Sequence, residues 1–320
     1  MNIEAKRKYM LLCIVILLIA AIAAGTSDFW KDSGVESAKQ GYVAVIRIDG
    51  PIYGGPDTDS ILSGSSGVTS EQIMKEFQTA RKDPQAKAIL VRINSPGGST
   101  GATQEIAEEM DKIRSSGKPI IISMGDMCAS AGYWLASKGN YIFASPATIT
   151  GSIGVYMDYT NVEDLMDKLG IKNEKIKSGA HKDILSMYRP MTGEEKEMVQ
   201  TMVDDIYNQF VQTVADGRKM DENKVRSIVR SIADGRILTG KQAQDLGLVD
   251  AMGNYYDALS YAASSGGIQS ENIPVKSYGS GVSLKGILSG EARNLSGIFG
   301  KALADSFKES VAGSSVPSMK

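Results

Sequence analysis

The sequence has 320 residues, of which 42% are hydrophobic and 22% are charged. That length allows two domains or one large domain with appended segments, and the composition is that of an ordinary globular protein. A formal net charge of −2 argues against a nucleic-acid-binding surface, and the single histidine, His181, excludes a zinc site built on several histidines. The two cysteines, Cys13 and Cys128, indicate no disulfide framework and no metal motif.

The N-terminus is typical of a membrane anchor. Residues 9–27 contain no charged side chain, and as a helix they would span roughly 28 Å, about the thickness of the hydrocarbon core. Lys6, Arg7 and Lys8 precede this run, so the N-terminus should be cytoplasmic and the body extracytoplasmic. The alternative is a cleaved signal peptide with Ala21-Ile22-Ala23 as its cleavage site, which also exports the body. The anchor interpretation predicts a cytoplasmic N-terminus, a transmembrane helix and a linker at residues 1–8, 9–27 and 28–41.

Strand and helix patterns alternate between residues 42 and 263. Apolar runs predict strands at 42–48, 87–93, 119–124, 141–143 and 148–157. Amphipathic stretches predict helices at 69–82, 101–115, 129–137 and 192–215. The last of these begins with a Thr192–Glu195 capping box and has an apolar face formed by Val199, Met202, Val203, Ile206, Phe210 and Val214. This alternation predicts an α/β domain with a largely parallel sheet.

The C-terminal region, residues 264–320, is rich in Ser and Gly. Apolar residues recur in it at helical spacing from Leu284 to Phe307. Such a segment could dock on the body, on a neighbouring subunit or on a bilayer, or it could be a weakly amphipathic tail.

Ser130 is the first candidate for chemistry. It follows a predicted buried strand and opens a helix, where free N–H groups and the helix dipole stabilise a developing negative charge. Two other interpretations stay open at this point. Ser130 could be an ordinary N-cap, and Cys128 could be the nucleophile instead.

Three further segments could contribute to a site. Residues 95–99 (SPGGS) form a glycine-rich strand-to-helix turn that is either an oxyanion site or an ordinary turn. Residues 178–183 contain His181 and Lys182, and a lysine is a usable base only where its surroundings lower its pKa. Residues 235–242 imitate a phosphate-binding loop, but Gln242 replaces the metal-binding hydroxyl, so we interpret that similarity as accidental.

Taken in order, five motifs resemble one family. They are SPGGS at 95–99, ASAGYW at 129–134, TGSIGV at 150–155, SGAHKD at 178–183 and ADGRILTGKQAQDLGLVD at 233–250. From residue 42 to 263, together with the N-terminal anchor, the chain resembles the signal peptide peptidase (SppA) family. These are membrane-anchored Ser-Lys peptidases with a ClpP/crotonase-type fold, a spiral of β-β-α units.

The resemblance implies a role for individual residues. Ser130 matches the nucleophile, Lys182 the general base and Ser152 the serine that orients the lysine. The N–H groups of Gly97 and Ser130 correspond to the oxyanion hole, and Gly98 and Ala131 to the substrate-binding positions. Ala131 departs from the family's usual glycine and adds a methyl group near the nucleophile. His181 becomes a bystander, and neither a metal nor another cofactor is implied.

The resemblance also implies a function. The protein is expected to be an endopeptidase that degrades released signal peptides and other unfolded or hydrophobic peptides at the outer face of the cell membrane. Its expected partners are these peptides, the membrane through the N-terminal helix, and copies of itself in a ring or dome, with no nucleic acid. Two alternatives from other classes are a crotonase-like thioester enzyme and a non-catalytic membrane scaffold. Export argues against the first, because CoA is cytosolic.

Overall fold

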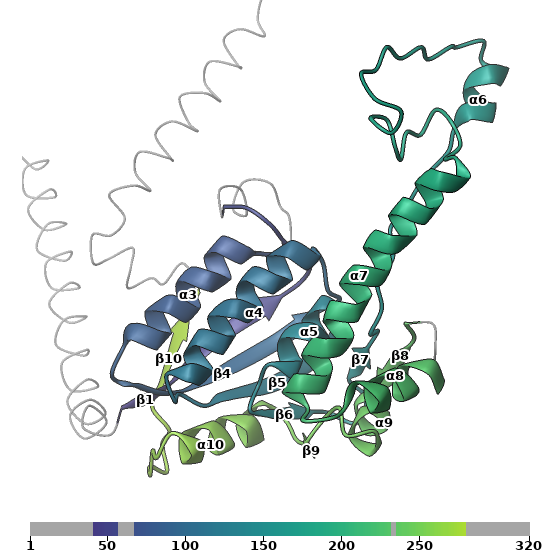
Figure 1. The fold of residues 1–320 in the computed structure, drawn as a ribbon. Coiled ribbons are helices and arrows are strands. Elements are labelled where there is room, and N and C mark those ends of the chain that lie inside the picture. Colours follow the sequence, from purple (N-terminus) through teal and green to yellow (C-terminus); the bar gives the residue numbers. More distant parts are fainter. Residues whose placement is uncertain (1–40, 57–66, 232–234, 280–320) are drawn as a thin grey trace, which may run out of the picture. The chain divides into compact units, whose positions relative to one another are not determined.

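The computed structural model describes residues 41–56, 67–231 and 235–279 (Figure 1). The predicted membrane anchor at 9–27, almost all of the linker, and the tail from residue 280 onward lie outside these residues. Within the described part of the chain, no helix is both long enough and apolar enough to cross a membrane.

The framework is a mostly parallel sheet, as the alternation of strands and helices predicts. Its strands lie in the order β10-β1-β4-β5-β6-β9, with β7 paired to β5 and β8 paired antiparallel to β7. A separate parallel pair is formed by β2 and β3. The bounds are β1 Tyr42–Asp49, β2 Ile52–Tyr53, β3 Val68–Thr69, β4 Ala86–Ser95, β5 Ile120–Ala129, β6 Tyr141–Ala144, β7 Ile149–Gly151, β8 Ile237–Thr239, β9 Ala251–Met252 and β10 Val275–Tyr278.

The central strands are apolar on both faces because helices cover both sides of the sheet. In β1, Val43 and Val45 belong to one buried cluster, and Ile46 and Ile48 belong to the other. Near-continuous apolar runs are typical of parallel strands buried on both sides. The layers are visible in Figure 1, with α3 (Ser70–Lys82), α4 (Thr100–Ser115) and α5 (Ala131–Ser137) on one face and α10 (Tyr255–Ser265) on the other.

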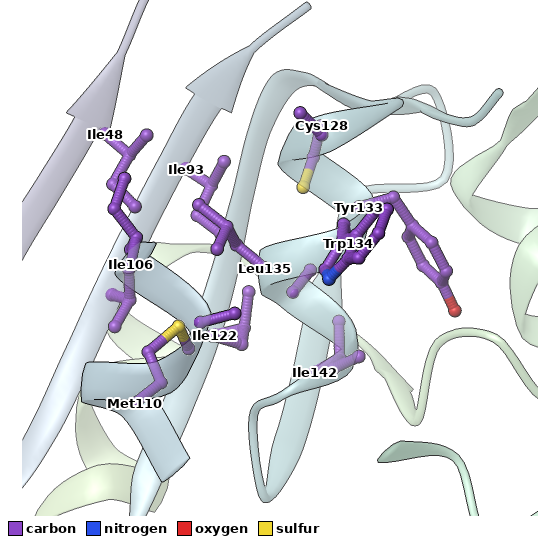
Figure 2. Packing of buried hydrophobic residues seen from close by; sticks show 14 of the residues in the cluster. Ile48, Ile93, Ile106, Met110, Ile122, Cys128, Tyr133, Trp134, Leu135 and Ile142 are labelled. Atoms are coloured by element: carbon purple, nitrogen blue, oxygen red, sulfur yellow. The ribbon is translucent and has the colours of Figure 1, made fainter. Parts of the chain in front are cut away.

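Side-chain caps mark the starts of two helices on this face of the sheet. The Thr69 side chain accepts the N–H of Gln72 at the start of α3, and the Ser99 side chain accepts the N–H of Ala102 at the start of α4. Figure 2 shows how α4 then packs, with Ile106 and Met110 near strand residues such as Ile93.

A long helix, α7 (Gly193–Gly217), leads away from the sheet and carries residues 158–192 at its outer end (Figure 1). That outer segment, which we call the arm, contains the short helix α6 (Glu163–Lys168). The capping box between Thr192 and Glu195 is confirmed. The predicted apolar face of α7 is buried only in its C-terminal half, around Phe210 and Val214, whereas Met202 is 53% exposed.

Two segments differ from the predicted boundaries. The strand expected at 148–157 ends at Gly151, because Ser152 takes a positive φ of 51° that an extended strand does not allow. Part of the region treated as tail is ordered, since α10 runs to Ser265 and β10 pairs in parallel with β1.

The segment that imitates a phosphate-binding loop, residues 235–242, links two helices. α8 (Glu222–Ser231) precedes it and β8, and α9 (Gly240–Asp245) starts with a capping box between Thr239 and Gln242. Gln242 therefore has a structural role as a capping residue.

Candidate active site

Ser130 lies at the sharp turn between β5 and α5. Its backbone has φ 54° and ψ −124°, a strained conformation for a non-glycine residue that costs about 1–3 kcal/mol. Although Ser130 occupies the N-cap position of α5, its side chain makes no capping hydrogen bond. The interpretation of Ser130 as an ordinary cap therefore fails. The hydroxyl is left available in a half-buried position at the positive end of a helix.

The pairing of β5 with β7 brings Ser152 next to this turn. Ala129 is in register with Gly151, and the N–H of Ser130 donates to the carbonyl oxygen of Gly151 at 2.9 Å. Ser152 follows directly, and its own N–H donates to the carbonyl of Arg236 at 3.2 Å. Two serines that are 22 positions apart (152 − 130) thus line the same cavity.

The glycine-rich turn at 95–99 packs against Ser130 from the other side. Ile52 of β2 donates its N–H to the Gly97 carbonyl at 2.9 Å and accepts the N–H of Ser99 at 2.8 Å. Gly97 and Gly98 have φ values of 112° and 156°. A Cβ on Gly97 would lie 2.9 Å from the Cβ of Ser130, and a Cβ on Gly98 would lie 2.1 Å from the Ile52 carbonyl oxygen. Only glycine fits at both positions.

Both N–H groups expected to form the oxyanion hole already have acceptors. The N–H of Gly97 donates to Ser95 Oγ at 3.1 Å, and that of Ser130 donates to Gly151. Two neighbouring N–H groups are better placed. Because Gly97 and Ser99 bond to β2, the intervening N–H of Gly98 points to the opposite side of an extended chain. Ala131 begins α5, so its N–H has no acceptor within the helix.

A cavity of about 790 Å³ extends from these groups, within the usual size range of ligand sites. It contains Ser130, Ser152 and Gly98, and it is bounded by the chain after Ser152 and by one side of α7. Its remaining lining residues are Pro96, Ile153, Gly154, Val155, Tyr156, Met157, Asp158, Gln200, Val203, Asp204, Tyr207 and Gly235. The contribution of α7 was not found from the sequence, where its apolar side chains indicated only core packing.

Cys128 does not act as a nucleophile. It is fully buried, and its Sγ lies 3.4 Å from the Gly132 carbonyl oxygen, to which the thiol donates. Burial raises the pKa of this thiol well above its ordinary range. The thiolate, which is the reactive form of cysteine, is therefore scarce near neutral pH.

Within one chain, Lys182 does not reach the cavity that contains Ser130. Lys182 is exposed in a turn of the arm and is absent from the residues that line the cavity. At the inner end of α7, Phe210 stacks on Trp134 of α5 with ring centroids 4.7 Å apart. Glu195, at the arm end, is 15 residues away along the same helix (210 − 195), or about 22 Å. The turn of the arm that carries Lys182 is therefore separated from Ser130 by more than the length of a lysine side chain, although Asp158 at the start of the arm lines the cavity.

An α/β fold that presents a strained serine at a strand-to-helix turn, beside a glycine-rich loop and a cavity, is the architecture of a serine hydrolase. Comparison with known proteins narrows this class. The sequence model of peptidase family S49 matches residues 112–293, more than half of the chain. The chain belongs to this family, which contains the SppA-type serine proteases.

Curated relatives agree with the family. Protease 4 of Salmonella typhi is 39% identical over 223 residues, which are 70% of this chain and 34% of that protein. A putative protease of Synechocystis sp. is 40% identical over 68% of this chain and 74% of its own length. The putative signal peptide peptidase SppA of Enterococcus faecium is 35% identical over 75% of this chain and 68% of its own length. The chain thus spans about a third of the Salmonella protein.

Proposed function

We propose that the protein is a serine endopeptidase in which Ser130 is the nucleophile and Lys182 of a neighbouring subunit is the general base. The observation that carries the proposal is the position of Ser130. It has a strained backbone and an uncapped hydroxyl, and it shares a cavity with Ser152 and Gly98.

The reaction follows from these positions. The neutral amine of Lys182, held by the Ser152 hydroxyl, takes the proton of Ser130 as Oγ attacks the peptide carbonyl. The N–H groups of Gly98 and Ala131 stabilise the oxyanion, where one such donor typically contributes ~10²–10³ in rate. We propose these two donors in place of the N–H groups of Gly97 and Ser130, because the latter are engaged elsewhere. Lys182 then protonates the leaving amine, and water hydrolyses the acyl-enzyme.

Supply of the base by a second subunit is supported by the exposed surface of the arm and the chain leading to it. Ile176, Leu169 and Tyr156 are at least 62% exposed. Several large apolar side chains on one projecting segment are typical of a surface covered by another chain. A homo-oligomer would cover them and would also carry each Lys182 toward the cavity of a neighbour.

The fold and the location complete the proposal. β1 is followed by β2 and then α3, and β4 is followed by the bridge between Gly98 and Ile52 and then α4. This repetition of strand, short strand and helix supports a ClpP/crotonase-type spiral. We further propose unfolded or hydrophobic peptides, including released signal peptides, as substrates at the outer face of a cell membrane. The apolar part of the cavity lining and the similarity to the putative signal peptide peptidase of Enterococcus faecium support this assignment.

The test is hydrolysis of a fluorogenic peptide by purified variants. Ser130→Ala and Lys182→Ala should each abolish cleavage, whereas His181→Ala should retain most of it. Mixing the two inactive variants as dissociated subunits and reassembling them should restore about a quarter of the sites, because half of the serines and half of the lysines are intact on random pairing. Full activity of either single variant refutes the dyad, and a mixture that stays inactive refutes supply by a second subunit.

A further inference from the structure

The turn that carries Lys182 is bound by an arginine, Arg189. Arg189 donates from Nε and Nη2 to the two carboxylate oxygens of Asp183, at 3.0 and 2.7 Å. Asp183 is the residue directly after Lys182, and its side chain is only 12% exposed. A two-point pair of this kind fixes orientation as well as distance.

The same guanidinium also binds the start of α7. Its Nη1 and Nη2 atoms donate to the carboxylate of Glu195 at 2.7 and 2.6 Å, and the Glu195 side chain is 1% exposed. Glu195 also accepts the N–H of Thr192 at 2.9 Å as part of the capping box. Arg189 therefore ties the Lys182 turn to the end of a helix whose other end stacks on α5, the helix that begins after Ser130.

Two lysines lie beside Asp183 together with Arg189. Lys177 donates to Asp183 at 2.6 Å, and Lys175 lies 4.0 Å from it. Arg189 and Lys177 hold the pKa of the Asp183 carboxyl well below its usual range, so it is ionised throughout the working range of the enzyme.

His181 and Glu194 are the other titratable groups beside Arg189, Asp183 and Glu195. The two imidazole nitrogens of His181 each lie 3.7 Å from a carboxylate oxygen, Nε2 from Glu194 and Nδ1 from Glu195. Neither contact replaces the arginine, because neither reaches Asp183.

We propose that Arg189 is the positioning residue of the general base. It fixes the turn that presents Lys182 to the Ser130 of a neighbouring subunit. The inference rests on the proposed Ser-Lys function. An error of about 1 Å in the position of a catalytic group can cost ~10²-fold in rate.

The experiment compares Arg189→Met with Lys196→Met in the full-length, assembled enzyme. Lys196 is exposed on α7 and next to Glu195, so its variant removes the same charge without touching the network. We expect Arg189→Met to lower kcat about 10²-fold with KM little changed, and Lys196→Met to behave as wild type. Arg189→Lys should recover only part of kcat, since one ammonium cannot make both two-point pairs.

The split between kcat and KM, together with the partial recovery in Arg189→Lys, separates positioning from simple stability. If Lys182→Ala is inactive but Arg189→Met has the same kcat as Lys196→Met, the inference is overturned. A loss of activity that only follows the amount of assembled protein also overturns it. An active Lys182→Ala variant refutes the underlying function instead.

Discussion

Gly98 offers a sharp test of the proposed oxyanion hole. The Cβ of Gly98→Ala would lie 2.1 Å from the Ile52 carbonyl oxygen, whereas ordinary contacts begin at 3.4 Å, so the turn must move by 1.3 Å (3.4 − 2.1). The φ of 156° adds strain for a residue with a side chain. That movement breaks the bonds between Ile52 and the turn and displaces the Gly98 N–H, which points away from β2.

The Gly98→Ala substitution should lower both the activity and the stability of the enzyme, and the two effects can be measured separately. Losing one oxyanion donor should lower kcat by about 10²–10³, or roughly 2.7–4 kcal/mol of transition-state stabilisation. Backbone strain should lower the free energy of unfolding by about 1–3 kcal/mol. Steady-state hydrolysis of a fluorogenic peptide measures the first effect, and urea unfolding measures the second.

Gly101→Ala provides the matched control. Gly101 is an exposed residue in the first turn of α4, and a Cβ there would meet nothing within 4 Å. This variant should keep wild-type kcat and should be equally stable or more stable, by up to about 1 kcal/mol. A folded Gly98→Ala enzyme whose kcat stays within a factor of three of the Gly101→Ala value would remove Gly98 from the oxyanion hole.

Three further predictions concern the surroundings of the site. Phe210→Ala should lower the free energy of unfolding by about 3–5 kcal/mol, because this ring is 1% exposed and stacks on Trp134; a loss below about 1 kcal/mol would mean that the inner end of α7 is not anchored there. Hydrogen bonds from Arg189 and from the backbone of Thr192 lower the pKa of Glu195 to about 2, so the stability that its ionised form provides is present above pH 5 and lost as pH falls toward 2. The stability difference between wild type and Glu195→Gln should disappear over that range, and a difference independent of pH would contradict the assignment. Peptide mapping after alkylation of the native protein should find Cys128 unmodified, whereas rapid modification would show that its burial is wrong.

Much of the fold could be predicted because the signals are local. The apolar runs at β1, β4 and β5 reflect burial on both faces of a sheet, and Thr69 and Thr192 mark helix starts through bonds only three residues long. The position of Ser130 between strand and helix is a local signal of the same kind. The family resemblance also came from short motifs in a fixed order, and the match to peptidase family S49 confirms it.

The direction of individual N–H groups could not be predicted in this way. Gly97 and Gly98 are adjacent and chemically identical, and only the bonds to Ile52, more than 40 positions earlier, decide which of their N–H groups points away from β2. In the same way, β10 belongs to the sheet because of its pairing with β1, more than 200 residues away.

The sequence by itself determined most of the elements, two of the helix caps, and the choice of the serine and lysine that we propose as the dyad, because these depend on patterns within a few residues. Tertiary structure alone decided where those groups stand relative to one another. The rigid length of α7 separates Lys182 from Ser130, and Arg189 joins the Lys182 turn to that helix. The distance in space between residues 130 and 182 depends on how the helices and strands pack. The number of residues between them in the sequence does not reveal that distance.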